Sequence, residues 1–237
     1  MQKEKKILVF TATYNEKENI VKLINSISKF CPNADILVID DNSPDNTAEE
    51  VLNLKKTNEK IYLIKRDSKA GLDTAHKRAY NYALEKNYDF LITMDADLSH
   101  DPSELINFIN NLEIYPFVIG SRYITGGKCL MKKRRLFLSR FGNILIKKVL
   151  GINCNEFTTS YRGFNLKKIG NFNLNQVNAK GYSFFMQTIY ELSKIKVQIK
   201  EIPITFYDRS SGYSKLPKIE ILRTLKNLVL LFYKKHR

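Results

Sequence analysis

Short apolar runs and longer amphipathic stretches alternate along almost the whole chain of 237 residues. The short runs have the length of buried strands, and the stretches between them show the periodicity of helices. Strands are expected at 6–11, 35–40, 60–65, 88–94, 117–121 and 197–206. Helices are expected at 17–29, 47–56, 72–86, 102–113, 134–150, 183–194 and 217–235. This alternation predicts an α/β fold in which helices cover both faces of a mainly parallel sheet.

The fourth expected strand ends in a pair of carboxylates. It reads FLITMDADLSHDP, with Asp95 and Asp97 two residues apart. Because side chains alternate along a strand, these two carboxylates lean to the same side, where they can share one hard cation with a diphosphate. The pattern suggests a metal-dependent nucleotide-sugar site. It is equally typical of a strand that runs into a helix capped by Ser99 or Asp101.

Two other expected strands also end in polar loops. TATYNE at 11–16 follows the first strand, and DDNSPDNT at 40–47 follows the second. In an open α/β sheet, ligands gather where strands end and helices begin, so acidic and aromatic residues from several loops can converge on one pocket. Taken singly, each loop could be an ordinary turn followed by a helix cap.

The order of these motifs resembles a known family. The segments that carry the resemblance are ATYNE at 12–16, DDNSPDNT at 40–47, GLDTA at 71–75, DADLSH at 95–100 and GSRY at 120–123. They occur in the order used by inverting family 2 glycosyltransferases. Three later segments, TTSYRGF, KGYSF and EIPITFYDRSSGYSK, resemble the distal motifs of dolichol-phosphate mannosyltransferases and their bacterial polyprenyl-phosphate relatives. The resemblance covers about residues 6–216.

The resemblance implies a GT-A fold in a single domain without transmembrane spans. We expect the glycosyltransferase domain at 1–215 and a basic amphipathic helix at 216–237. The implied reaction moves a hexose, with mannose from GDP-mannose as the leading expectation, onto dolichyl or another polyprenyl phosphate. Mg²⁺ or Mn²⁺ would stabilise the charge that develops on the departing diphosphate.

The resemblance also implies roles for individual residues. Those expected around the nucleotide-sugar are Ala12, Tyr14, Glu16, Asp41, Asp95, Ala96, Asp97, Arg122, Arg209 and Lys215. Asp97, Arg122 and Arg209 are expected to be catalytic, and Asp95, Asp97 and Ser99 to hold the metal. Arg135 and Ser139 are expected to face the acceptor phosphate. Arginine suits the binding of phosphate groups because its guanidinium matches phosphate oxygens in bidentate fashion.

Two residues near these motifs invite other roles. His100 follows the carboxylate pair, but it belongs to no cluster of metal ligands, so we expect it to hydrogen-bond the loop that carries the aspartates. Asp73 replaces the second glycine of the family's GLGTA motif. Its negative charge lies near the expected diphosphate path, so the side chain either points away from that path or changes how the loop closes.

The charge of the chain implies acidic partners. With 39 Lys and Arg against 24 Asp and Glu, the formal charge is +15, which fits anionic lipid, phosphates or nucleic acid. Basic amphipathic stretches at 132–150 and 218–237 fit peripheral contact with a membrane, either direct or through a small membrane partner. Each could instead pack its apolar side on the core and leave its charged side in solvent.

Other features bear on location. The N-terminal MQKEKK enters a strand at once and leaves no room for a secretory signal. The longest apolar run, Leu228–Tyr233, is far shorter than the ~20 residues that span a bilayer. Three scattered cysteines without a CxxC pair favour a reducing compartment. We therefore expect a cytoplasmic protein at the cytosolic face of a membrane.

Two alternatives stay open at this point. A glycosyltransferase with the same donor site could use a glycan hydroxyl as acceptor, and it would then need a general base beside the anomeric carbon. A basic module that binds nucleic acid would also fit the charge. The aromatic residues are not interleaved with Lys and Arg in any RNA-reading signature, so we expect no nucleic-acid partner.

Overall fold

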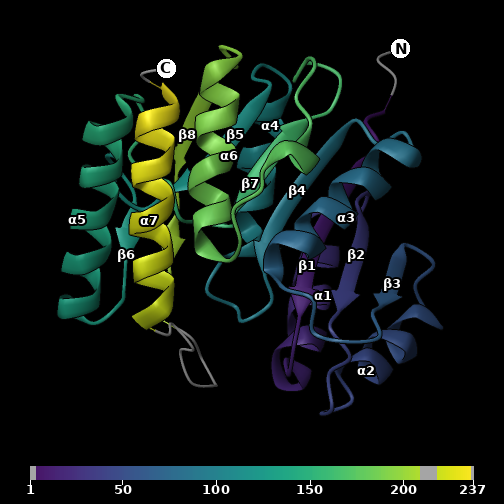
Figure 1. Ribbon diagram of the computed structural model, residues 1–237. Helices are drawn as coiled ribbons and strands as arrows, with labels where there is room; N and C mark the ends of the chain where they lie inside the picture. Colours follow the sequence, from purple (N-terminus) through teal and green to yellow (C-terminus); the bar gives the residue numbers. More distant parts are fainter. Residues whose placement is uncertain (1–3, 209–217, 236–237) are drawn as a thin grey trace.

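The computed structural model describes residues 4–208 and 218–235, and Figure 1 shows its ribbon. The main sheet has seven strands in the order β3-β2-β1-β4-β7-β5-β8. Their bounds are β1 Ile7–Thr13, β2 Asp35–Asp40, β3 Ile61–Lys65, β4 Phe90–Asp95, β5 Phe117–Ser121, β7 Arg162–Asn165 and β8 Ile199–Pro203. A second, two-stranded sheet pairs β6, Lys128–Cys129, with β9, Thr205–Phe206.

Seven α-helices connect and flank these strands in the described part of the chain. They are α1 Lys17–Phe30, α2 Thr47–Lys55, α3 Leu72–Glu85, α4 Leu105–Leu112, α5 Lys133–Leu150, α6 Tyr182–Lys194 and α7 Lys218–Lys235. Two short 3₁₀ helices lie at Pro102–Glu104 and Leu174–Gln176. The predicted α/β fold with a mainly parallel sheet is confirmed, and each expected helix is present within a few residues of its expected bounds.

The main sheet differs from the expectation at two places. β7 was not expected, and it lies antiparallel between β4 and β5. Its four residues are too few to show a periodicity of their own. The strand expected at 197–206 breaks after Pro203: β8 pairs with β5, whereas β9 leaves the main sheet to pair with β6. The expected boundary between 215 and 216 lies outside the described residues.

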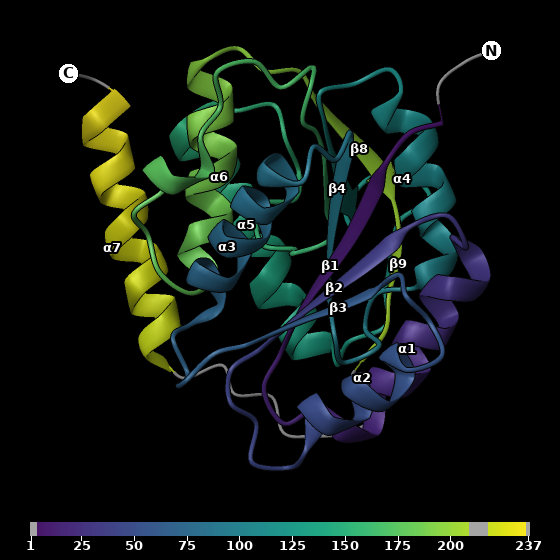
Figure 2. The ribbon, with the colours of Figure 1, turned by 90° about the vertical axis from the view of Figure 1, so that its right-hand side faces the viewer.

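The alternation of side chains along β1 divides the core between the two faces of the sheet. Leu8 and Phe10 join the cluster that α3 and α6 cover, and Ile7 and Val9 join the cluster that α1 and α4 cover. Figure 2 shows the two layers, with α3 and α6 on the left of the sheet and α1, α2 and α4 on its right. Both faces of the sheet are therefore buried, as its apolar strands require.

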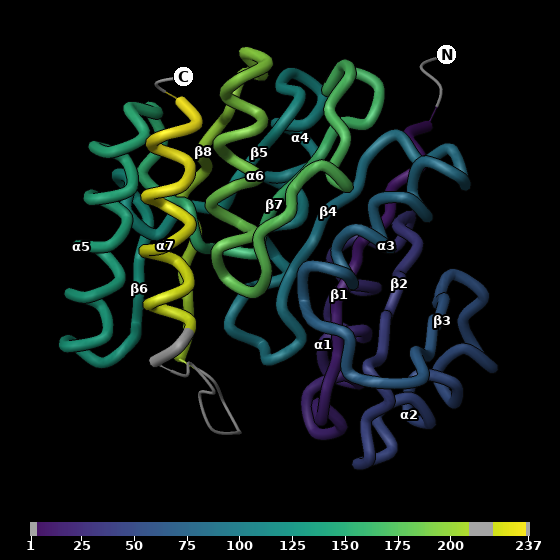
Figure 3. The backbone as a smooth tube through the Cα atoms, in the orientation of Figure 1, coloured from purple at the N-terminus to yellow at the C-terminus, as the bar shows by residue number. Residues whose placement is uncertain are grey.

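Helices α5 and α7 lie beyond the β8 edge of the sheet, at the left of Figure 1. They pack against each other, and α7 also packs against α6. The two helices run in the same direction, with their N-terminal ends at the lower edge of Figure 3. Within residues 4–208 and 218–235, none of the helices combines the length and the apolar character that crossing a membrane requires.

Candidate donor and acceptor site

The loops after β1, β2 and β4 meet at one edge of the sheet, the lower edge in Figure 3. In the strand register, Ala12 at the end of β1 lies opposite Asp95 at the end of β4. On its other side, Thr13 lies opposite Asp40 at the end of β2. The tertiary structure thus brings together the three strand ends that the sequence predicted to converge. This is where a parallel sheet offers its ligand crevice.

Hydrogen bonds between side chains hold two of these loops together. The Asp40 carboxylate is fully buried and accepts from Thr13 Oγ1 at 2.8 Å, Ser43 N at 2.9 Å and Ser43 Oγ at 2.6 Å. Asn15 and Asn42, in the loops that follow β1 and β2, both have positive φ. Asparagine tolerates this left-handed region better than most residues. The loops expected to surround the nucleoside are therefore built on fixed turns.

The loop that carries the carboxylate pair is also fixed from several sides. Asp97 Oδ1 accepts from Ser99 N at 3.1 Å and from Ser99 Oγ at 2.6 Å. Asp95 accepts a short hydrogen bond from the Ser160 hydroxyl, and its backbone N–H donates to His100 Nδ1 at 3.1 Å. Leu98 has a φ of 61°, an unusual conformation for a leucine that this network maintains.

His100 supports the loop, as expected. Its Nδ1 accepts from the Asp95 amide, and its Nε2 lies 3.3 Å from Thr159 Oγ1. The imidazole is stacked against Tyr161 and is almost completely buried. Burial lowers the pKa of His100, although the nearby Asp95 and Asp97 carboxylates oppose the shift. Both ring nitrogens are therefore engaged with the protein.

The carboxylate pair fits a divalent cation that is shared with a substrate. Within the described residues, no group of three or more His, Cys, Asp and Glu side chains forms a cage for a metal. Asp95 is about one-third exposed at its side chain, whereas Asp97 is buried. Mg²⁺ is typically bound by one or two carboxylates together with substrate phosphates, so this donor set suits a cation that arrives with a diphosphate. Ser99 donates to Asp97 and so orients that carboxylate.

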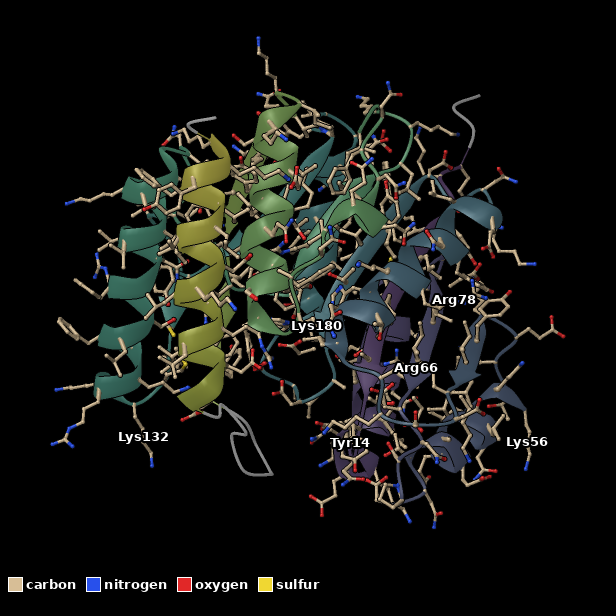
Figure 4. The ribbon with its side chains drawn as sticks, viewed as in Figure 1. Tyr14, Lys56, Arg66, Arg78, Lys132 and Lys180 are labelled. Carbon is tan, nitrogen blue, oxygen red and sulfur yellow. The ribbon has the colours of Figure 1, made fainter. Side chains whose placement is uncertain are left out.

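The expected nucleoside residues lie on the β1 and β2 side of the site. Tyr14 carries the ammonium of Lys69 over its ring, 3.8 Å from the ring centroid. Glu16 precedes α1, and its carboxylate accepts from Asn19 Nδ2 at 2.8 Å. Asp41 is buried and forms an ion pair with Arg66. Figure 4 shows Tyr14 and Arg66 on this side of the molecule.

Arg66 was not among the expected site residues. Besides its ion pair with Asp41, it donates to Gly71 O at 3.1 Å and to Thr74 Oγ1 at 2.6 Å. It thereby ties the carboxylate after β2 to the first turn of α3. One feature of the sequence could have indicated Arg66 as a site residue: it directly follows the strand β3, just as Asp41 directly follows β2.

Asp73, in the first turn of α3, bonds to the start of another helix. Its Oδ1 accepts from the amide of Gly181 at 3.3 Å, at the N-terminal end of α6. The residue is buried, and its charge faces the positive end of a helix dipole, which stabilises it. This hydrogen bond joins α3 to the N-terminal end of α6.

Arg122 is held by a partner that the sequence did not reveal. Its Nε and Nη2 donate to the two oxygens of Glu156 at 2.7 and 2.9 Å, and Nη2 also donates to Thr158 Oγ1 at 3.0 Å. Both charged groups are buried. Burial alone would lower the pKa of Arg122, but the Glu156 carboxylate outweighs this effect and raises it. Burial alone would raise the pKa of Glu156, but the neighbouring Arg122 guanidinium outweighs this effect, so the pKa of Glu156 is lowered.

A cavity of about 260 Å³ lies beside Arg122, between the end of β5 and the first half of α5. Its lining includes Arg122, Tyr123, Leu136 and Arg140. The Tyr123 hydroxyl donates to Ser139 Oγ at 2.8 Å, so Ser139, one of the expected acceptor residues, bonds to a side chain that lines this cavity.

Of the other expected basic residues, one lies on α5 and two lie outside the described residues. Arg135 stands one helical turn before Ser139, and its Nη1 is 3.6 Å from Asp208 Oδ1. Residues four apart share a helix face, so Arg135 and Ser139 point to the same side of α5. Arg209 and Lys215 lie outside the described residues. Their assignment to the donor stays a prediction.

Comparison with known sequences identifies the family. The model of glycosyl transferase family 2 matches residues 8–171. Polyprenol monophosphomannose synthase of Mycolicibacterium smegmatis is 34% identical over 212 residues, which are 88% of this chain and 80% of that protein. Undecaprenyl-phosphate mannosyltransferase of Micrococcus luteus is 31% identical over 212 residues, which are 89% of this chain and 87% of that protein.

Solved structures support the same fold. Glucosyl-3-phosphoglycerate synthase from Mycobacterium tuberculosis in complex with uridine diphosphate has a TM-score of 0.69 at 14% identity, covering 96% of this chain and 80% of that one. A mannosyltransferase from Pyrobaculum calidifontis in complex with GDP-Man and Mn²⁺ has a TM-score of 0.61 at 18% identity, covering all of this chain and 65% of that one. The fold is of the expected GT-A type. Since the family model spans well over half of its length, the chain belongs to glycosyltransferase family 2.

Proposed function

We propose that this chain transfers mannose from GDP-mannose to a polyprenyl phosphate, with inversion at the anomeric carbon. The observation that carries the proposal is the pair Asp95 and Asp97 at the end of β4, next to the ends of β1 and β2. The two relatives described above are named for mannose transfer to polyprenyl acceptors, and this supports the choice of sugar and lipid. We further infer that the reaction takes place at the cytosolic face of a membrane.

On the donor side, the chain's own residues bind and orient the nucleotide. Tyr14 offers an aromatic face to the base, and Asp41 and Glu16 offer carboxylates to base N–H groups or ribose hydroxyls. Asp95 and Asp97, with Ser99 fixing Asp97, would hold Mg²⁺ or Mn²⁺. The bound cation supplies Lewis-acid stabilisation of the diphosphate as it leaves. Mn²⁺ is present in solved structures of this fold, which supports a divalent cation here.

The cavity beside α5 supports a phosphate as the acceptor. Of the described residues that line it, two are arginines and none is a carboxylate or an imidazole. A polyprenyl phosphate is anionic at neutral pH, so its oxygen can attack the anomeric carbon without a general base. A new carbon–oxygen bond then forms on the face opposite to the bond that breaks, and the nucleoside diphosphate departs. A glycan hydroxyl would need a base at this place.

A direct assay tests this proposal. The protein is incubated with GDP-mannose, a polyprenyl phosphate and Mn²⁺, and the lipid product is identified by mass spectrometry and its anomeric configuration by NMR. We expect an inverted mannosyl phospholipid. Asp97→Asn should lower kcat/KM by roughly 100-fold or more, because the metal loses a charged ligand. Asp101→Asn, the same change four residues away at the start of a 3₁₀ helix, is the matched control.

The donor can be checked independently of transfer. At saturating concentrations, the correct nucleotide-sugar with Mn²⁺ should stabilise the fold by about 2.7 kcal/mol when present at about 100 times its Kd. GDP-, UDP- and dTDP-sugars are compared by thermal unfolding. Stabilisation by UDP- or dTDP-sugars alone would reject GDP-mannose as the donor. Lack of transfer with every donor and every polyprenyl phosphate would reject the function as a whole.

A further inference from the structure

The chain that leads from α5 into β7 is buried, although it has no regular secondary structure. We call the part from Glu156 to Arg162, the first residue of β7, the bridging segment. Each of its residues except Thr158 is buried. Buried irregular backbone has carbonyl and amide groups that need partners inside the protein, so such a segment is kept only where the fold supplies those partners.

Arg162 supplies several of these partners. Its guanidinium is almost completely buried and donates to Phe157 O at 3.0 Å and to Thr159 O at 2.8 Å. A further bond, to Phe185 O at 2.9 Å, ties the segment to α6. If the segment rotated, this buried cation would lose its acceptors, which costs free energy. The bonds of Arg162 therefore hold the segment in one arrangement.

The neighbouring strands hold the middle of the bridging segment. The Thr93 hydroxyl on β4 donates to Ser160 O, and Gly120 N on β5 donates to Tyr161 O at 3.0 Å. Because its carbonyl is bonded to β4, Ser160 lies beside the strand that ends at Asp95.

The Ser160 side chain bonds directly to the carboxylate pair. Its hydroxyl donates a short hydrogen bond to Asp95 Oδ1. Ser160 is 3% exposed, whereas the Asp95 side chain is 36% exposed. A partly exposed carboxylate turns easily about its last side-chain torsion, so a cation would have to select one orientation of it. The bond from a fixed, buried hydroxyl removes that freedom before the cation binds.

The preceding residue supports the same loop. Thr159 Oγ1 lies 3.3 Å from His100 Nε2, and His100 Nδ1 accepts from the Asp95 amide. Since Nδ1 is the acceptor, the proton of the neutral imidazole is on Nε2, which donates to Thr159. Two adjacent residues of the bridging segment therefore reach Asp95. Thr159 supports its backbone through His100, and Ser160 holds its carboxylate.

The first residue of the bridging segment supports the cavity beside α5. Glu156 accepts from Arg122, which lines that cavity. The segment thus presents a carboxylate to one part of the candidate site and hydroxyls to the other. Packing against the core would require neither, because apolar side chains serve that purpose.

We propose that Ser160 is a positioning residue for cation binding: its hydroxyl holds the Asp95 carboxylate in the orientation that a divalent cation requires. The inference rests on the proposed function, because it takes the carboxylate pair as the cation site. Ser160 acts through Asp95 and does not bind the cation itself. Hydrogen bonds to a ligating carboxylate from outside the coordination sphere act in this way.

Calorimetric titration separates the contribution of the cation from that of the nucleotide. GDP and UDP are each titrated into the whole chain, once with excess Mn²⁺ and once with EDTA. We expect Mn²⁺ to strengthen binding of the nucleotide that the chain uses. Ser160→Ala should weaken binding in Mn²⁺ by roughly 10- to 100-fold, the usual effect of losing such a bond, and should leave binding in EDTA unchanged.

Two further variants complete the design. Ser183→Ala is the matched control, because the Ser183 hydroxyl is also buried but donates to a backbone carbonyl, Lys180 O, at 2.7 Å. It should bind like the wild type under both conditions. Asp95→Asn removes the charge that Ser160 orients. Adding Ser160→Ala to Asp95→Asn should therefore weaken binding in Mn²⁺ by only about 3-fold or less, because the two residues act as one unit. Circular dichroism verifies that all variants are folded.

The possible outcomes distinguish this inference from the proposed function. If Ser160→Ala binds like the wild type in Mn²⁺, the inference is wrong and the proposed function stands. An equal loss in EDTA would also overturn it, since Ser160 would then act on the fold or on the nucleotide. Full additivity with Asp95→Asn would mean that Ser160 does not act through Asp95. If Mn²⁺ strengthens wild-type binding of neither nucleotide, the carboxylate pair is not the cation site, and the cation step of the proposed function fails together with this inference.

Discussion

The buried pair of Arg122 and Glu156 offers a sharp test of how the site is held together. The perturbation is Glu156→Gln, which keeps the shape of the side chain and removes its charge. In the wild type, the carboxylate accepts from Arg122 Nε and Nη2, from the Thr158 amide and hydroxyl, and from the Thr159 amide. A glutamine can keep one oxygen for these donors, but its amide group would face Arg122 Nε, donor against donor.

The expected cost follows from these contacts. Removing one partner of a buried ion pair costs about 3–5 kcal/mol, because the other charge is left uncompensated. Since one oxygen remains to accept hydrogen bonds, we expect the lower end of this range, about 3 kcal/mol. For a domain of this size, that corresponds to a fall in Tm of roughly 6–12 °C. The control is Glu113→Gln at an exposed pair with Lys5, 4.0 Å apart, where the cost should be at most about 1 kcal/mol.

The pH dependence gives a second check. The folded protein holds the pKa of Glu156 below its unfolded value of 4.5, with Arg122 outweighing the opposing effect of burial. The stabilisation is therefore fully present above that value and is lost as the pH falls through the folded pKa. The difference in unfolding free energy between wild type and Glu156→Gln should be constant near neutral pH and should shrink in acid.

Urea unfolding followed by circular dichroism measures both quantities. The reasoning is refuted if Glu156→Gln unfolds within about 1 kcal/mol of the wild type, since that is the cost of an exposed pair. A free-energy difference that grows on acidification would refute it as well. Either result would mean that Glu156 does not hold the Arg122 side chain in place. Another contact would then have to orient the Arg122 guanidinium at the cavity.

Three other predictions concern the donor side and the core. Arg66→Gln should weaken nucleotide-sugar binding by roughly 10-fold in calorimetry while kcat changes little, because Asp41 loses the partner that orients it. Arg66→Lys should recover part of the lost affinity. Unchanged affinity in both variants would contradict the role of Arg66 in orienting Asp41. Asp73→Gly should lower the free energy of urea unfolding by about 1–2 kcal/mol, since it removes the bond to Gly181 and puts a glycine in the first turn of α3. Burial lowers the pKa of His76 to about 3. Its NMR ring signals should therefore stay constant from neutral pH to about pH 5, whereas a shift over that range would mean that the imidazole is open to solvent.

Much of the architecture and the family could be predicted from local patterns. The apolar run before Asp95 has the length of a strand, and the stretch at 134–150 has the periodicity of the helix α5. Both features depend on residues close together in the chain. The order of the motifs was also sufficient to indicate the family, because the loops that follow strand ends carry the chemistry of this fold.

The contacts that fix the site depended on the tertiary structure. Arg122 and Glu156 are 34 residues apart, and Asp41 and Arg66 are 25 apart, so nothing in either local sequence marks them as partners. The antiparallel insertion of β7 between β4 and β5 was likewise invisible, because four residues hold no periodic signal.

The sequence by itself determined where the helices and most of the main-sheet strands form, which strand ends are polar, and which helices are amphipathic. Only the tertiary structure decided that α5 and α7 each have one apolar side in the core and another exposed, and that the two helices pack against each other. The physical reason is that periodicity reports which residues share a face of a helix. Which face the core takes is decided by the neighbours that pack against it.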